Sequence, residues 1–386
     1  MVPDACPDVQ SFRALLRGGC EEPTERIMSQ TDSYRVVSPG RVNLIGEHTD
    51  YTFGHVLPMA TDLHTSLEAT PAERVTVRSS AVDDERSFET DDREPEGTWI
   101  DYVKGCYAVL EEAGHEPGGF AGELGGTLPL GSGLSSSASL ELAVMALLDD
   151  VYDLGLSRER MAELSQRVEN DFVGVSCGIM DQFAIALGQD GHALHIDTET
   201  LEYDPVPFPE DIQVVVYHTG VERGLVDSEY NQRRETVESA LEALGVDTSK
   251  AVREEHLAAL PPLHRQRLGY VVRENRRVER ATDALENGNI DLFGAILEAA
   301  HEDIAENYEA SCEELDFFVE TAIEQGAYGA RLTGAGWGGA AIALVESAGA
   351  ETFARGVHDA YCERFPDHEP HYHLITPSDG VTVERV

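Results

Sequence analysis

The segment 40–51, GRVNLIGEHTDY, concentrates side chains that can do chemistry. It places an arginine, two carboxylates, an imidazole and a phenol around two glycines. Because Glu47, His48 and Asp50 cannot all leave one strand on its solvent face, at least one of them is expected to point into a polar site. Carboxylates accept hydrogen bonds from hydroxyl groups and an imidazole can donate or accept, which suits a cavity for a sugar. The alternative is a solvated turn after a strand.

A second segment, 131–137, reads GSGLSSS and precedes an apolar run from Leu140 to Leu148 that predicts a helix. Glycines let the backbone approach an anion, and the N–H groups of a first helical turn have no partners within the helix. The segment therefore predicts a phosphate site, whereas the alternative is that Ser135 or Ser136 only caps the helix. It is not a Walker loop, because the chain contains no Gly-Lys pair.

Two carboxylates in predicted helices could serve that phosphate site. Glu169 follows the apolar Val168 and is turned from it by about 100°, so the spacing favours a solvated side chain. A Mg²⁺ ion that bridges phosphates takes only one or two protein oxygens, and Ser137 with Glu169 would be enough. Asp181 stands among apolar residues at a predicted helix start, where it could be a catalytic base or only a cap.

A third glycine-rich segment, 334–339, reads GAGWGG and lies between two predicted strands. Its four glycines in six positions exceed what a turn requires. The segment therefore predicts a flat backbone loop that approaches a ligand closely, and the alternative is a simple connection between strands.

The composition limits the class of protein. At 386 residues the chain is long for one core, so two domains are expected. The net charge of −44 argues against nucleic-acid and membrane partners. No apolar run approaches the ~20 residues of a membrane span, and the first thirty residues carry no apolar signal core, so a cytoplasmic protein is expected. Six scattered cysteines without a CxxC pair favour reduced thiols over a zinc site or disulfides.

The acidic residues are spread along the chain rather than gathered in a tail, and only Lys104 and Lys250 are lysines. This pattern resembles the proteins of salt-in halophiles, in which molar salt screens charges beyond about 3 Å. We therefore expect the fold to loosen at low ionic strength.

The elements that must position these side chains alternate between strand and helix, which predicts an α/β or α+β fold. Residues 1–30 are expected to form an acidic helical lead-in and 81–97 an acidic loop. Prolines at 205, 207 and 209 place a boundary near 208, so the expected domains are 1–208 and 209–386. Strands are expected at 34–37, 56–60, 75–78, 212–217, 329–332 and 340–345, with a short strand within the turn-rich stretch 114–126, a hairpin near 192–204 and a closing strand. Helices are expected at 99–112, from 140, from 157, after 182 and at 228–244, 268–287, 290–307, 313–325 and 349–364.

Together these segments resemble the GHMP small-molecule kinases, and segment 40–51 is similar to the signature of the galactokinases among them. Residues 177–182, CGIMDQ, are similar to the catalytic-aspartate segment of that family, and 227–234 to its sugar-contacting tyrosine segment. The resemblance implies an α+β fold of two domains. The N-terminal domain would be ribosomal-S5-like and the C-terminal domain ferredoxin-like, with the active site between them.

The resemblance also implies roles for individual residues. Asp181 would face the anomeric hydroxyl, with Arg41 beside it as the second catalytic residue. The sugar would contact Glu47, His48, Thr49, Asp50, Gly178 and Tyr230. The phosphates of ATP would lie on Gly131, Ser132, Gly133, Leu134, Ser135, Ser136 and Ser137, with Ser80 and Trp99 near the nucleotide. Ser137 and Glu169 would hold Mg²⁺.

The implied reaction is ATP-dependent phosphorylation of D-galactose at its anomeric hydroxyl, giving α-D-galactose 1-phosphate and ADP. Phe53 and Trp337 depart from the galactokinase pattern, so N-acetylgalactosamine and L-arabinose remain alternative sugars. A non-catalytic galactose sensor is an alternative from another class, although such relatives lack two residues of the serine–alanine stretch that is intact at 137–139. Mevalonate and homoserine kinases do not share the 47–50 run. A small sugar is the only partner implied, and monomer and homodimer both stay open.

Overall fold

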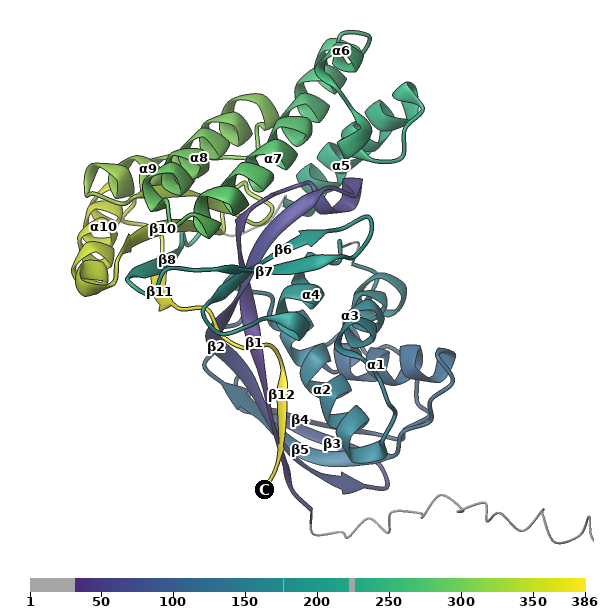
Figure 1. Ribbon diagram of the computed structural model, residues 1–386. Coiled ribbons are helices and arrows are strands. Elements are labelled where there is room, and N and C mark those ends of the chain that lie inside the picture. The colour runs from purple at the N-terminus through teal and green to yellow at the C-terminus, as the bar shows by residue number, and fades with distance from the viewer. Residues whose placement is uncertain (1–31, 176, 222–225) are drawn as a thin grey trace, which may run out of the picture.

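The computed structural model describes residues 32–175, 177–221 and 226–386, which form two sheets with helices packed against them (Figure 1). The expected helical lead-in at 1–30 lies outside the described residues. The first sheet has the strand order β12-β1-β2-β5-β3-β4, and β6 pairs with both β2 and β7. Its strands are β1 (Tyr34–Ile45), β2 (His55–Ala72), β3 (Val75–Ser79), β4 (Asp84–Phe88), β5 (Gly119–Gly126), β6 (His192–Asp197), β7 (Tyr203–Pro207) and β12 (Thr382–Arg385).

The second sheet is antiparallel, with the order β11-β8-β10-β9. Its strands are β8 (Ile212–His218), β9 (Gly329–Thr333), β10 (Ala340–Glu346) and β11 (His371–Ile375). The helices that belong to the first half are α1 (Ile100–Glu112), α2 (Ser136–Tyr152), α3 (Arg158–Arg167) and α4 (Met180–Leu187). Those of the second half are α5 (Val226–Leu244), α6 (Glu254–Leu257), α7 (Pro262–Glu286), α8 (Ile290–Asp303), α9 (Glu313–Glu324) and α10 (Ala350–Arg364). This arrangement confirms the α+β expectation.

Within the described part of the chain, three buried apolar clusters hold the layers together. The first lies between the first sheet and α1 to α4, and the second lies between the second sheet and the helices that cover it. The third cluster joins the two halves, because Val42, Leu44 and Leu57 of β1 and β2 pack with Val214 and Val216 of β8. Burial of apolar surface on both sides of this junction stabilises the relative placement of the two sheets.

Most predicted elements lie within a few residues of the observed ones, but two corrections are needed. The expectation of a loop over 81–97 is wrong, because β4 pairs antiparallel with β3 and buries Phe88 in the core. Its acidic composition hid a strand in which Phe88 is the one fully buried residue. β1 and β2 are also much longer than expected, since β2 runs for 18 residues.

The division of the chain at 208 stays a prediction. The last strand does not follow this division, because it belongs to the sheet of the first half. After the second sheet is complete, β12 returns to the first sheet and pairs with β1 (Figure 1). Among the described residues, no helix combines the length and apolar character needed to cross a membrane.

Candidate active site

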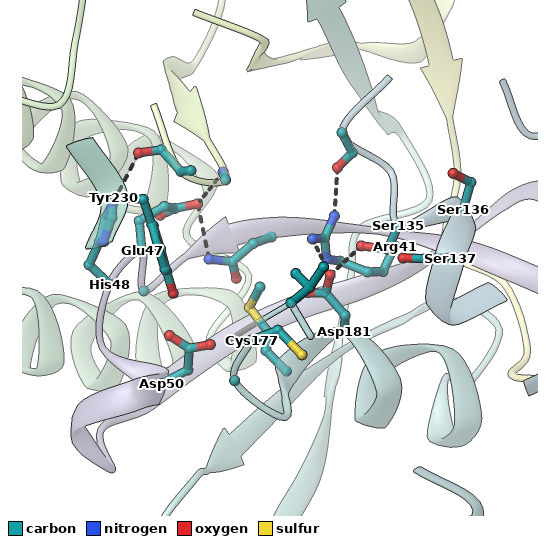
Figure 2. A pocket seen from close by; sticks show the side chains of 18 of the residues that line it. Arg41, Glu47, His48, Asp50, Ser135, Ser136, Ser137, Cys177, Asp181 and Tyr230 are labelled. Carbon is teal, nitrogen blue, oxygen red and sulfur yellow. Dashed lines mark hydrogen bonds and ion pairs between the residues drawn. The ribbon is translucent and has the colours of Figure 1, made fainter. Parts of the chain in front are cut away.

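A cavity of about 620 Å³ lies where the end of β1, the loop before α2, the start of α4 and the start of α5 meet (Figure 2). Figure 2 shows Glu47, His48, Asp50 and Tyr230 gathered on one side, with Arg41, Asp181 and the three serines on the other. The predicted site residues that line the cavity are Arg41, Glu47, His48, Asp50, Gly131, Gly133, Ser135, Ser136, Ser137, Gly178, Asp181 and Tyr230. Segments that are far apart in the chain therefore converge on one space.

The centre of the cavity is an ion pair between Arg41 and Asp181. Arg41 donates from Nε to Oδ1 at 2.6 Å and from Nη2 to Oδ2 at 2.5 Å, which is the bidentate geometry that fixes a carboxylate plane. The Ser135 hydroxyl donates to Oδ2 as well. Asp181 does not cap α4, because the cap position is Ile179 and no side chain caps this helix. The capping alternative for Asp181 is therefore wrong.

Backbone geometry aims Arg41 at the cavity. The β1–β2 register shifts between Pro39 and Arg41 and again between Asn43 and Ile45, and such irregularities re-aim side chains. A Cβ at Gly40 would lie 2.8 Å from the Leu134 carbonyl oxygen, so only glycine lets the loop before α2 approach β1 this closely. Arg41 then donates from its backbone N–H to Leu134 O at 3.0 Å and from Nη1 to Gly133 O at 2.6 Å.

The loop before α2 has the backbone of a phosphate cradle. Gly131, Gly133 and Ser135 all have positive φ, and Ser135 does so at 59° although it carries a side chain. Ser135 occupies the cap position of α2 without making a side-chain capping bond, so the capping alternative is wrong for this serine. Leu134 packs its side chain into the core, and Ser132 donates to Pro129 O at 3.0 Å. Neither of these two side chains lines the cavity.

Glu169 is buried beside Ser137 in the first turn of α2. Its side chain accepts a hydrogen bond from Ser137 Oγ at 2.7 Å, and the residue is only 7% exposed. The expectation of a solvated Glu169 from spacing is wrong, because α3 ends at Arg167 and a π-helical segment, η2 (Val168–Val173), follows it. The wider π turn changes the angle between successive side chains. Burial raises the pKa of Glu169.

The segment 40–51 holds Glu47 in a buried position. Its Oε1 accepts hydrogen bonds from Asn43 Nδ2 at 3.0 Å and from the Gly334 N–H at 3.3 Å. Its Oε2 forms an ion pair with Arg331. Burial raises the pKa of Glu47 to about 7, and the charge of Arg331 opposes that shift.

His48 forms part of the wall with both ring nitrogens occupied. Nε2 lies 3.0 Å from the Ala335 carbonyl oxygen, which can only accept, so this nitrogen carries the proton. Nδ1 can then accept from the Tyr51 hydroxyl at 3.2 Å. Burial lowers the pKa of His48 to about 4, and the Tyr230 ring packs 5.5 Å from the imidazole. His48 is thus a neutral group that orders the glycine loop and Tyr230.

Asp50 and Gly178 are in close contact across the cavity. A Cβ on Gly178 would lie 1.8 Å from Asp50 Oδ2, so the contact requires glycine at this position. Burial raises the pKa of Asp50 to about 6. Cys177 and Met180 line the cavity on the same side as Gly178.

Some predicted residues are not brought to the cavity. The Thr49 hydroxyl lies 2.7 Å from both the Gly46 and His55 carbonyl oxygens. Its side chain therefore holds the backbone of the turn, in place of the expected sugar contact, and it does not line the cavity. Ser80 is exposed with its hydroxyl on Leu124 O at 3.0 Å, and Trp99 donates to Asp84 at 3.1 Å. A nucleotide contact for Ser80 and Trp99 stays a prediction that the cavity lining does not support. Phe53 is 47% exposed and does not line the cavity either.

Sequence reasoning missed Arg331 and Glu274, which are both fully buried. Arg331 Nη1 donates to Glu274 Oε1 at 2.9 Å, and the Gly46 N–H donates to the same oxygen at 3.1 Å. A signal was available, because Arg331 interrupts a predicted buried strand. Arginine is almost never fully buried without a paired carboxylate, so a partner should have been sought.

Comparisons with known proteins agree with this arrangement. The family model described as "GHMP kinases N terminal domain" matches residues 101–189, and "GHMP kinases C terminal" matches 281–363. Both halves of the fold are thus those of GHMP small-molecule kinases. A third model, "Galactokinase galactose-binding signature", matches residues 25–71, which include the motif that ends β1.

Individual relatives show which family of GHMP kinases the chain belongs to. Galactokinase from Thermococcus kodakarensis is 56% identical over 90% of this chain and 99% of its own length, and that from Pyrococcus furiosus is 50% identical over the same shares. The crystal structure of Lactococcus lactis galactokinase complexed with galactose has a TM-score of 0.86 at 35% identity, covering 92% of this chain and 96% of that one. The chain belongs to the galactokinase family. A mevalonate kinase from Methanococcus jannaschii, at 18% identity and a TM-score of 0.65, shares only the fold.

Proposed function

We propose that the chain transfers the terminal phosphoryl group of ATP to the anomeric hydroxyl of D-galactose, giving α-D-galactose 1-phosphate and ADP. One observation carries the proposal: the Arg41–Asp181 pair lies in a single cavity between the Glu47–Asp50 motif and the glycine–serine loop. A sugar seated on the motif would have its reacting hydroxyl at Asp181, and phosphates on the loop would reach the same point. Phosphoryl transfer depends mainly on such alignment and on charge stabilisation.

Asp181 is the group that would receive the hydroxyl proton. Its carboxylate is held in one plane by Arg41 and is 28% exposed on its side chain, so a hydroxyl can approach it. General-base assistance of this kind contributes typically about 10²–10⁴-fold to the rate. Arg41 also donates to the backbone of the phosphate loop, and its positive charge would stabilise negative charge that develops between the two substrates.

Ser137 and Glu169 fit a magnesium site. They offer two oxygen ligands, one of them a buried carboxylate, next to the first turn of α2. Mg²⁺ prefers oxygen ligands and usually takes one or two from the protein when it also binds phosphates. A bound Mg²⁺ would neutralise phosphate charge, while the loop N–H groups and the dipole of α2 orient the anion.

Galactose is favoured over related sugars by the family signature and by a relative of known structure. The Lactococcus lactis relative was crystallised with galactose, and the galactokinase signature covers the motif residues that line the present cavity. The departure at Phe53 does not argue against galactose, because this side chain is exposed and does not line the cavity.

A sugar panel tests the function. The protein is incubated with ATP, Mg²⁺ and galactose, N-acetylgalactosamine, L-arabinose or glucose, ADP release is measured by a coupled assay, and the product is identified by NMR. We expect galactose to give the highest kcat/KM and a 1-phosphate product. Galactose binding without ADP release would instead indicate a sensor, and a higher kcat/KM for another sugar would overturn the substrate assignment.

A further inference from the structure

Glu47 comes from the first half of the chain, but groups from the second half hold it. The Tyr270 hydroxyl of α7 donates to the Glu47 carbonyl oxygen at 3.1 Å, and Glu274 of the same helix accepts from the preceding Gly46 N–H at 3.1 Å. Arg331 of β9 pairs with the Glu47 carboxylate, and the Gly334 N–H donates to it. The backbone and the side chain of Glu47 are therefore both fixed from across the junction.

We propose that Arg331, held by Glu274, is a positioning residue that sets the orientation and charge of Glu47 for sugar recognition. The proposal rests on the proposed function, because it assigns Glu47 to the sugar. Arg331 does not line the cavity, so it acts through Glu47 and not by touching the substrate.

Arg331 belongs to a buried group of charges in which each carboxylate is paired with an arginine. Its guanidinium contacts Glu47 through Nη2 and Glu274 through Nη1, and the side chains of all three residues are at most 1% exposed. Glu274 is also paired with Arg277 at 2.6 Å. Removal of Arg331 alone would leave Glu47 buried without its cation, which favours protonation or a change of rotamer.

The other end of this network supplies a matched control. Arg277 and Arg273 both pair with Asp303, at 2.8 and 2.6 Å. Arg273 is 40% exposed on its side chain and lies in the same helix as Glu274, but it does not contact Glu47. Loss of the Arg273 charge therefore makes the same chemical change without removing the partner of Glu47.

The hydrogen bonds of Arg331 do not reach the phosphoryl-transfer centre. Besides the two carboxylates, Arg331 donates from Nε to the Leu332 carbonyl oxygen at 3.1 Å. Asp181 is instead held by Arg41 and Ser135. A change at Arg331 should thus weaken sugar binding while leaving the nucleotide and the chemical step nearly unaffected.

The experiment compares Arg331→Met with Arg273→Met. We expect Arg331→Met to raise the KM for galactose by about 10- to 100-fold, the range for loss of a hydrogen bond to a charged group. The KM for ATP and kcat should stay within about threefold. Arg273→Met should leave all three constants close to wild type. A galactose KM within about twofold of wild type in Arg331→Met, or an equal rise in both KM values, would overturn the proposal.

A double variant separates an effect on Glu47 from general destabilisation of the fold by an unpaired buried charge. Glu47→Gln combined with Arg331→Met removes one charge of each sign, so the buried network stays neutral. If Arg331 acts only through Glu47, the double variant should have the same galactose KM as Glu47→Gln alone. A further rise in the double variant would contradict this role, even if Arg331→Met alone does not fold.

Failure of this inference is distinguishable from failure of the proposed function. The function fails if the wild-type protein forms no galactose 1-phosphate. The positioning role is judged on the ratio of variant to wild-type KM, or of dissociation constants from calorimetry without nucleotide, for whichever sugar of the panel the wild-type protein binds. A ratio near one for that sugar defeats the positioning role alone.

Discussion

The Asp181 carboxylate accepts hydrogen bonds from Arg41 twice and from Ser135 once. All three donors come from segments that precede it by many residues, so its orientation depends on the assembled fold. The bidentate pair with Arg41 fixes the plane of the carboxylate, and the proposed role of Asp181 as acceptor of the hydroxyl proton depends on that orientation.

Replacement of this carboxylate should remove most turnover. Asp181→Asn cannot accept a proton, and its amide group cannot accept both hydrogen bonds from Arg41. We expect kcat to fall by about 10²- to 10⁴-fold while the melting temperature changes little. Asp171→Asn, an exposed aspartate in η2, serves as the control and should be active. A kcat near the wild-type value in Asp181→Asn would refute the assigned role.

Two further carboxyls should make sugar binding depend on pH. Burial raises the pKa of Glu47 to about 7 and that of Asp50 to about 6. A raised pKa means that the ionised acceptor is present above this value and is lost as the pH falls through it. The KM for galactose should therefore rise by about tenfold between pH 8 and pH 6.

The measurement is a pH series of both KM values. The KM for ATP should not follow the same curve, because Glu47 and Asp50 lie on the side of the cavity away from the three serines, which are the proposed phosphate site (Figure 2). A galactose KM that is flat over this range would show that these carboxyls do not titrate in the sugar complex.

At the scale of elements, η2 decides where Glu169 points. The π-helical segment continues α3 and ends at Val173, and Gly174 follows at the C-cap with a φ of 85°. Single π turns inside helices are frequent at functional sites, because they redirect one side chain without ending the helix. In this chain the redirected side chain is Glu169, which reaches Ser137 at the start of α2. Two helices thus supply the proposed metal ligands.

The role of this element is tested by a magnesium titration. Glu169→Gln keeps the shape of the side chain but removes its charge, so the Mg²⁺ concentration for half-maximal activity should rise by about tenfold or more. The galactose KM at saturating Mg²⁺ should stay near wild type. Asp171→Asn provides the control within the same π segment. An unaltered Mg²⁺ titration in Glu169→Gln would remove this residue from the metal site.

At the scale of the whole molecule, the charge of −44 is the dominant property. Both lysines are already used in ion pairs: Lys104 contacts Asp92 and Glu96, and Lys250 contacts Asp197 and Glu199. Most of the acidic surplus therefore has no cationic side chain to pair with. Repulsion among these charges opposes the compact state unless salt screens it.

Stability should accordingly increase with ionic strength. The screening length falls from about 30 Å at 0.01 M to about 3 Å at 1 M salt, so molar KCl should suppress most of the repulsion. We expect Tm by circular dichroism to rise by about 5 °C or more from dilute buffer to molar KCl, on the order of 2 kcal/mol for a domain of this size. A Tm that does not change with KCl would contradict the halophilic interpretation.

The features that the sequence predicted correctly depend on residues close together in the chain, and those that it missed depend on contacts between distant segments. The segments 40–51 and 131–137 were recognised because their chemistry depends on residue types that stand next to one another. Helix and strand positions were mostly correct, since apolar periodicity is also local. The strand β4 was missed because only its pairing with β3 and the burial of Phe88 distinguish it from an acidic loop.

By itself the sequence predicted the family and the α+β class, and it singled out Asp181 and Arg41 as the proposed catalytic pair, because these inferences depend on local motifs and their order. Only the tertiary structure decided that Glu169 faces inward, that the Thr49 hydroxyl serves the backbone and that Arg331 neutralises Glu47. The physical reason is that burial and charge pairing depend on which residues are close in three dimensions, and not on how close they are in the chain. A residue 284 positions away can set the charge of a motif side chain, and no spacing rule encodes that contact.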